Sequence, residues 1–266
     1  MRLFNKNILL ALALLAAAQG CDKEPVTPQD TGAPIMLSAA ESGTKALLDN
    51  GTFSATGNRI KIYDYYTPAA AGQGEQVYIN DFVKSEGLDN NIWPFVGNKY
   101  NWTPDGVHRF FGWLAEDVNM TSTEDAAANT PEEFFGAGFG YENKVLTIPS
   151  KTLTQTTPQF DFMYSNIFTT EPINLPVQLE FSHLFAAYYF SFTNNSPEPL
   201  ELESVQINIK SSAGASINYS GSAPSVNVAF QGSQPVIEKV YNSSVGSGKT
   251  IDVLLTGNEI TSSTDI

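Results

Sequence analysis

The chain has 266 residues, with 14 Lys and Arg against 28 Asp and Glu, so its formal net charge at pH 7 is −14. This acidic balance argues against partners that are themselves polyanions, such as nucleic acid or anionic lipid. With 42% hydrophobic and 12% aromatic residues the chain can bury a substantial core, which excludes an intrinsically disordered protein. The length fits one large domain or two moderate ones.

Residues 1–20 have the pattern of a secretory signal peptide. Arg2 and Lys6 precede an apolar stretch at residues 8–18, which is shorter than the roughly 20 residues that a transmembrane helix needs. Small residues then lead into Cys21, the single cysteine, as in chains cut by lipoprotein signal peptidase. We predict that the mature chain begins with a diacylated Cys21, because a spare unpaired thiol, the alternative, is unusual in an exported protein.

Residues 21–34 are rich in Pro, Thr, Gln, Asp and Gly and show no apolar period, which is typical of a flexible tether. The cluster at residues 22–24 resembles the surface-export signals of Bacteroidota lipoproteins and predicts an outer-membrane lipoprotein at the cell surface. In enterobacteria an acidic residue after the cysteine means inner-membrane retention, so this placement depends on the host. Removal of residues 1–20 takes away two basic and no acidic side chains, and the net charge becomes about −16.

Apolar and polar residues alternate repeatedly along the rest of the chain, as in strands with one buried face. The alternating segments are residues 59–62, 177–182, 205–210, 226–230 and 251–253. Residues 96–99 predict a tight hairpin between two aromatic runs, and the acidic residues 115–135 predict a long loop or a short helix. We therefore expect an all-β fold of antiparallel β-sandwiches.

A change in composition at residues 172–176 suggests a domain boundary. The part before it is rich in aromatic residues, and the part after it is rich in Ser, Asn and Val. We place an N-terminal β-sandwich domain at residues 35–176 and a C-terminal one at residues 177–266.

Several stretches together resemble the fimbrillin family of Bacteroidales, which contains the lipoprotein pilins and Mfa-like anchor or accessory proteins of type V pili. The stretches are the signal-peptidase site at Cys21, "GTKALLDNGTF" at residues 43–53, "RIKIYDYY" at 59–66, "NIWPFVGNKYNWTPDGVHRFFGWL" at 91–114 and "VQLEFSHLFAAYYFSFTNN" at 177–195. Each is moderately specific, whereas their order and spacing together are distinctive.

The resemblance implies two transthyretin-like antiparallel β-sandwich domains and assembly with other pilin subunits by strand exchange. In that family a first strand fills a groove of the N-terminal domain until a trypsin-like protease releases it and a neighbour's strand replaces it. Here residues 34–40 alternate as a short strand would, and Ile35, Leu37 and Ala39 are the candidate inward residues of an exchanged strand.

Lys45 is the candidate processing site, because it is the only basic residue between Lys23 and Arg59. A cut there would release both the lipid and the strand. The alternatives are a loop lysine without a role and an anchor subunit that is never cut.

The end of the chain departs from the family. The family usually continues past the early strands of the second domain to a donor segment, whereas residues 258–266 contain few apolar residues. We therefore expect the second domain to be incomplete, either as a truncated gene product or in a subunit that accepts a strand without donating one.

Catalysis is not expected, and neither is a cofactor or a metal. The two histidines, His108 and His183, lie in apolar strand patterns, and His183 fits a hydrogen-bonded structural role. Zinc would need three or four clustered ligands. The acidic pairs at residues 116–117, 124–125 and 132–133 could serve glycoside hydrolysis. A solvated acidic face explains them better, and calcium is disfavoured because there is no EF-hand spacing.

The sequence thus predicts a non-catalytic structural or adhesive subunit of a cell-surface pilus, anchored by lipid in the outer membrane and contacting a host or bacterial surface ligand. The rival interpretation is a glycan-binding surface lipoprotein of a carbohydrate uptake system. In that case exposed Trp93 and Trp102 would stack on sugar rings. Burial of both rings in the sandwich core is the simpler expectation.

Overall fold

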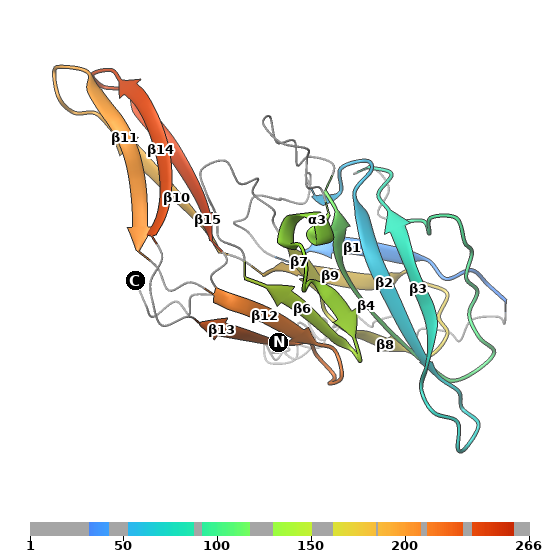
Figure 1. Ribbon diagram of the computed structural model, residues 1–266. Helices are drawn as coiled ribbons and strands as arrows, with labels where there is room; N and C mark the ends of the chain where they lie inside the picture. Colours follow the sequence, from blue (N-terminus) through green and yellow to red (C-terminus); the bar gives the residue numbers. More distant parts are fainter. Residues whose placement is uncertain are drawn as a thin grey trace, which may run out of the picture.

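The computed structural model describes residues 32–42, 53–87, 92–117, 130–150, 162–184, 186–208, 212–230 and 236–257. Cys21 and Lys45 lie outside these residues, and so do most of the acidic loop and the C-terminal nine residues. Within the described ranges the chain forms strands and one short helix, which confirms the all-β sandwich class (Figure 1).

The elements in the first part of the chain are β1 (Leu37–Glu41), β2 (Arg59–Thr67), β3 (Gln76–Lys84), β4 (Val107–Glu116), α3 (Pro131–Phe135), β5 (Gly140–Glu142), β6 (Val145–Pro149), β7 (Met163–Ser165) and β8 (Phe168–Thr170). The later elements are β9 (Val177–His183), β10 (Ala186–Thr193), β11 (Leu200–Asn208), β12 (Ser212–Asn218), β13 (Ser225–Phe230), β14 (Val236–Val245) and β15 (Thr250–Gly257).

A large seven-stranded sheet organises the body of the molecule. Its order is β1-β9-β7-β4-β2-β3, with β8 also paired to β4. All of its pairings are antiparallel except β1 with β9, which is parallel. The alternation in β2 appears directly in the structure, because Ile60 and Ile62 are buried while their neighbours Arg59 and Lys61 are partly exposed.

The two edges of this sheet are drawn together by residues 92–102, which we call the bridging segment. On one side Lys84 N donates to Pro94 O (3.0 Å) and Val96 N to Phe82 O (2.8 Å), which ties the segment to β3. On the other side it is hydrogen-bonded to residues 33–37. The sheet is therefore curled around the cluster that we call the inner core.

The inner core consists of buried residues from the curled sheet, the bridging segment and the segments just before β1, β2 and β9. These residues are Ile35, Leu37, Phe53, Ile60, Ile62, Ile79, Val83, Trp93, Trp102, Phe110, Leu114, Met163, Ile173, Val177, Leu179 and Phe181.

A four-stranded sheet with the order β13-β12-β6-β5 covers the opposite face of the large sheet. Between the two sheets lies a second cluster, which we call the intersheet core. It contains Phe111, Trp113, Phe134, Phe135, Leu146, Ile148, Phe162, Leu184, Ile217 and Tyr219. The short helix α3 contributes two of these rings; it begins after Thr130, whose Oγ1 accepts from Glu133 N, and has Pro131 in its first turn.

Strand β4 is buried on both faces because it lies between the two cores. Phe110 and Leu114 point into the inner core, and Phe111 and Trp113 into the intersheet core. Gly112 lies between them where a Cβ atom would collide with Lys61 O of β2, so this position requires glycine.

Strand pairing crosses the boundary that the sequence places at residues 172–176. Strand β9 lies inside the large sheet between β1 and β7, and β12 pairs with β6 from Gly214–Pro149 to Asn218–Val145. Both strands come from the proposed second domain, yet they build the two sheets of the first. Alternation within a strand identifies its buried face but not its pairing partner, which explains why the sequence placed them elsewhere.

The predicted hairpin at residues 96–99 is wrong. The aromatic runs on either side of it do not pair with each other, because their backbone groups bond outward to β3 and to residues 33–37. Gly97 does adopt a positive φ of 92°, as a turn requires.

Four strands form two ribbons that project from the body in Figure 1, namely β10 with β15 and β11 with β14. At their outer turns Asn194 is buried, and its side-chain amide donates to Glu198 O and Val245 O, both at 2.8 Å. This side chain joins the two turns and fixes the end of the projection.

Candidate functional site: the slot that holds β1

Strand β1 is inserted between two neighbours rather than lying at a free edge. On one side it forms a parallel ladder with β9, from Leu37–Val177 to Glu41–Phe181. On the other side Trp93 N donates to Leu37 O (2.8 Å) and Ile35 N donates to Tyr100 O (2.8 Å). Residues 35–41 therefore occupy a slot whose two walls are β9 and the bridging segment, and we call this the β1 slot.

The candidate exchanged-strand residues point into the inner core. Ile35 is 5% exposed and Leu37 is 2% exposed, and Ala39 packs against the same cluster. Met36, on the opposite face, is 36% exposed. Burying Ile35 and Leu37 stabilises the filled slot by about 1.5–3 kcal/mol for each side chain, before the entropy of ordering the strand is counted.

Polar contacts fasten the C-terminal end of β1 to β9. His183 Nε2 lies 3.1 Å from Glu41 Oε1. Ser42 N and Ser42 Oγ both donate to Phe181 O, at 2.7 and 2.9 Å. His183 thus has the hydrogen-bonded structural role that the sequence predicts, and these contacts lie just before residues 43–52, which contain Lys45.

Trp93 and Trp102 belong to the slot and its core rather than to the surface. They are 2% and 3% exposed, and the Trp93 ring lies 5.3 Å from that of Phe53, which in turn lies 5.1 Å from that of Phe181. A sugar-stacking platform needs an open ring face. The proposed glycan role of these two rings is therefore contradicted, because the curl of the large sheet encloses both of them.

Asp81 of β3 holds the bridging segment in place. Its Oδ2 accepts from Asn98 Nδ2 (2.7 Å) and from the Tyr100 hydroxyl (2.9 Å), and its Oδ1 accepts from Phe82 N (2.8 Å). Partial burial raises the pKa of Asp81, but these hydrogen bonds outweigh it, so that the pKa of this carboxyl lies below its usual value. The wall of the slot thus depends in part on an ionised carboxylate.

His108 forms a buried chain of hydrogen bonds with Asp64 and Thr103. Nδ1 lies 2.6 Å from Asp64 Oδ2, and Nε2 lies 2.8 Å from Thr103 Oγ1, which itself donates to Asp105 O. His108 thus has Nε2 against the Thr103 hydroxyl and Nδ1 against the Asp64 carboxyl group. Burial raises the pKa of Asp64. The hydrogen bond to His108 acts in the opposite direction but does not cancel this rise.

His108 and Asp64 are both 0% exposed, whereas Thr103 is partly exposed. Arg109 N also donates to Asp64 Oδ1 (3.0 Å), so the carboxylate joins β2 to β4. These contacts pair polar atoms that are buried beside the inner core.

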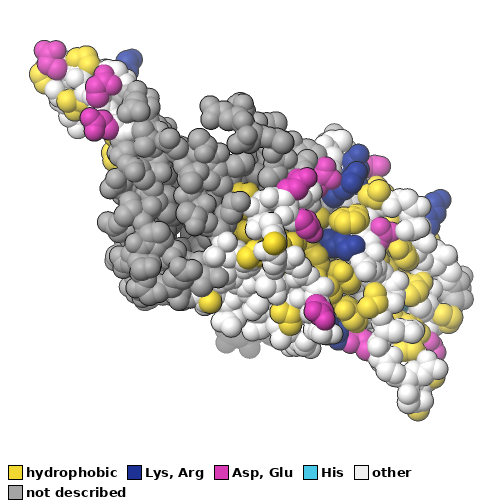
Figure 2. All heavy atoms as spheres, viewed as in Figure 1, with side chains coloured by type: hydrophobic (Ala, Val, Ile, Leu, Met, Phe, Trp, Pro, Cys, Tyr) yellow, Lys and Arg dark blue, Asp and Glu magenta, His cyan; other side chains and the backbone are white. Residues whose placement is uncertain are grey.

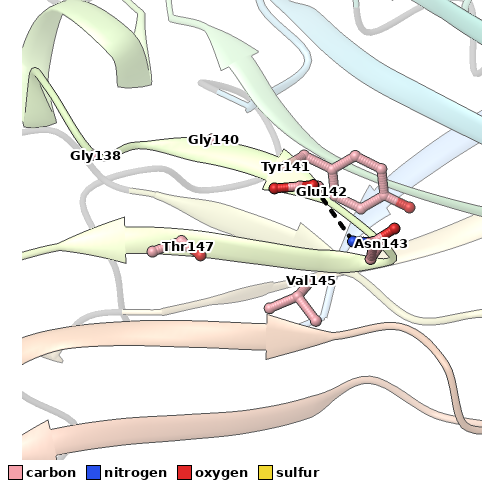
Figure 3. A pocket seen from close by; sticks show the side chains of 7 residues that line it. All are labelled: Gly138, Gly140, Tyr141, Glu142, Asn143, Val145 and Thr147. Carbon is pink, nitrogen blue, oxygen red and sulfur yellow. Dashed lines mark hydrogen bonds between the residues drawn. The ribbon is translucent and has the colours of Figure 1, made fainter.

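A shallow hollow of about 550 Å³ lies on the β5–β6 hairpin, lined by Gly138, Gly140, Tyr141, Glu142, Asn143, Val145 and Thr147 (Figure 3). Asn143 Nδ2 donates to Glu142 Oε1 across its rim (3.4 Å). The Tyr141 ring packs on Tyr63 with centroids 4.3 Å apart. The one aromatic ring that lines the hollow is therefore in contact with β2.

The described residues contain no cluster of three or more His, Cys, Asp or Glu that could hold a metal ion. In the same part of the chain no helix has the length and apolar character needed to span a membrane. Of the acidic pairs, Glu116 ends β4 and Glu132 and Glu133 form the first turn of α3, whereas residues 124–125 lie outside the described ranges.

No protein-family model matches the chain, and no curated protein matches it. A crystal structure of a "putative cell adhesion protein" from Bacteroides ovatus aligns with a TM-score of 0.45 and 16% identity, over 86% of this chain and 79% of that chain. A second such protein, from Bacteroides thetaiotaomicron, gives a TM-score of 0.33 and 11% identity, over 86% and 89%. Both TM-scores are too low to establish a shared fold.

Proposed function

We propose that this chain is a non-catalytic, lipid-anchored subunit of a cell-surface pilus with a structural or adhesive role, and that it assembles by exchanging β1 for a strand of a neighbouring subunit. The signal peptide and Cys21 support export to the outer membrane. The resemblance of residues 43–53, 91–114 and 177–195 to fimbrillins supports the pilus.

The observation that carries the proposal is the position of β1 in its slot. The strand is bonded on both sides, its inward side chains fill the inner core, and its link to Phe53 and β2 runs through residues 43–52. A cut after Lys45 would leave β1 bound by noncovalent contacts alone. Its departure would expose two rows of backbone donors and acceptors beside an apolar groove, which is the kind of site that accepts a foreign strand.

The energetics allow both retention and exchange. The buried side chains contribute a few kcal/mol together, and each ladder hydrogen bond adds about 0.5–1.5 kcal/mol. Ordering the strand offsets part of this. A strand with this net binding free energy remains in its slot. A longer or better-fitting strand from a neighbour can still displace it.

The experiment is to express the chain with its own signal peptide in a pilus-forming Bacteroidales host and to sequence the N-terminus of the protein in sheared surface filaments. We expect filaments to contain a chain that begins at Ala46. The Lys45→Ala variant should accumulate in the membrane fraction with Cys21 at its N-terminus. The control Lys249→Ala, at an exposed lysine in the turn between β14 and β15, should behave as wild type. Wild-type protein that stays in the membrane as an uncut monomer would overturn the proposal.

A further inference from the structure

The outer strand of the second sheet, β13, offers an edge of a different kind from the β1 slot. Its residues Ser225 to Phe230 pair with β12, and no described strand pairs with its other side. Such an edge presents a row of backbone N–H and C=O groups that can pair with another strand.

Strand β13 lacks the features that usually protect an edge. It is six residues long and contains no charged residue, no Pro and no Gly. The other edge of the same sheet, β5, has three residues and ends at the exposed Glu142. The edges of the large sheet, β1 and β3, are both hydrogen-bonded to the bridging segment. The short length of β5 and the charge of Glu142 discourage association at that edge. Strand β13 has neither protection.

The surroundings of β13 are also free of charge. Residues 211–237 include no Asp, Glu, Lys or Arg, in a chain whose net charge is −14. Figure 2 shows acidic side chains on both the body and the projecting strands of the face in view. Two copies of an acidic protein repel each other through most of their surface. The hairpin of β12 and β13 adds no charge to that repulsion and offers nothing to attract a cationic partner, which favours a second copy.

The order of side chains in β13 is complementary to itself. In an antiparallel pair centred on Asn227, each Val226 lies opposite the other copy's Val228, and each Ser225 lies opposite an Ala229. Val226 and Val228 are half-buried, and Val226 packs against the intersheet core, whereas Ser225, Asn227 and Ala229 are exposed. The pairing would therefore match valines on the inner face and the small residues Ser, Asn and Ala on the outer face.

We propose that β13 is an association edge at which two copies of this chain pair antiparallel around Asn227, so that the four-stranded sheet continues from one copy into the other. The contact is isologous, because the same five residues, Ser225 to Ala229, serve on both sides. This β13–β13 contact does not involve β1, and it would join two subunits side by side. A strand-to-strand contact of this size is small, so the dimer is weak and depends on concentration.

Sedimentation of the chain without residues 1–20, carrying Cys21→Ser, tests the proposal. We expect a monomer–dimer equilibrium whose Kd rises at least about tenfold in Asn227→Lys, because two ammonium groups would then face each other across the pair. Thr147→Lys is the matched control, since Thr147 is exposed on the same sheet but lies on the inner strand β6. It should leave the Kd unchanged.

Cross-linking provides a second measurement, which detects the dimer directly and does not depend on a variant that fails to dimerise. In the Cys21→Ser chain, Asn227→Cys should form a disulfide-linked dimer under mild oxidation, because directly opposed residues of an antiparallel pair have Cα atoms about 4.5–5.5 Å apart. Thr147→Cys should remain monomeric. A chain that stays monomeric at all concentrations, or a dimer unaffected by Asn227→Lys and not captured by Asn227→Cys, would overturn the proposal, the latter by showing that copies meet through another face.

Discussion

The two hydrophobic cores on opposite faces of the large sheet are closed in different ways. The intersheet core is closed by a regular four-stranded sheet whose strands lie far apart in the sequence. The inner core is closed by the five-residue strand β1 and the bridging segment, which is held by isolated bridges and single hydrogen bonds. A wall made of short independent pieces can lose one piece without unfolding the rest, and this is what strand exchange requires.

The largest expected effect comes from breaking the intersheet core. Phe111 is fully buried and its ring stacks on that of Tyr219, with centroids 4.2 Å apart. Phe111→Ala should lower the free energy of unfolding by about 3–5 kcal/mol, because it leaves a cavity where two sheets meet. Urea denaturation measures this, and a loss below about 1 kcal/mol would show that the second sheet is not firmly packed.

A smaller loss is expected at the inner core. Leu37→Ala should cost about 2–3 kcal/mol, toward the lower end for such changes, because β1 can shift in its slot and partly fill the space. Met36→Ala, on the exposed face of the same strand, is the control and should change stability by less than about 0.5 kcal/mol. Equal effects at the two positions would contradict the inward orientation of Leu37.

Arg109 offers a third comparison, because it fixes the β12–β13 hairpin to the large sheet. Its guanidinium donates to Tyr219 O and Gly221 O, and it also lies 3.8 Å from Glu75 Oε1. Arg109→Met keeps much of the side-chain volume and should lower stability by about 1.5 kcal/mol. Denaturation should show this loss together with faster amide exchange in residues 212–230, and unchanged exchange there would argue against the clamp.

The smallest effect concerns pH and the bridging segment. Because the pKa of Asp81 is depressed in the folded state, its ionised form contributes stability above the usual carboxyl value of about 3.9, and this is lost as the pH falls through the lower folded pKa. The free energy of unfolding of wild type should therefore exceed that of Asp81→Ala near neutral pH. The difference between the two should shrink as the pH falls. A gap that stays constant down to pH ~2 would contradict this linkage.

Much of the strand content was predictable, because period-two patterns depend on neighbouring residues. The alternations at Ile60 and Ile62 and at Val177 to Phe181 correspond to β2 and β9, and the short helix falls within the predicted residues 115–135. The burial of Ile35 and Leu37 also follows from alternation. Whether β1 is exchanged, whether Lys45 is cut and whether Cys21 carries lipid stay predictions.

The partners of the strands were not predictable in the same way. Nothing in residues 145–149 indicates that they pair with residues 214–218, because pairing over such a separation depends on the shape of both sheets. The same holds for Trp93 and Trp102. Burial of both rings was the simpler expectation from the sequence, but the way the curled sheet and the bridging segment enclose them was not predictable. The parallel pairing of β1 with β9 was likewise not foreseen.

The most direct test of the central claim is exchange of a labelled peptide covering residues 32–42. The chain from residue 21, cut after Lys45, should take up the peptide at one copy per molecule, while the Lys45→Ala chain treated in the same way should not. A peptide with Leu37→Asp should fail to bind, because it would bury a charge in the inner core. The account is contradicted if the cut chain ignores the wild-type peptide, or if cut and uncut chains take it up equally.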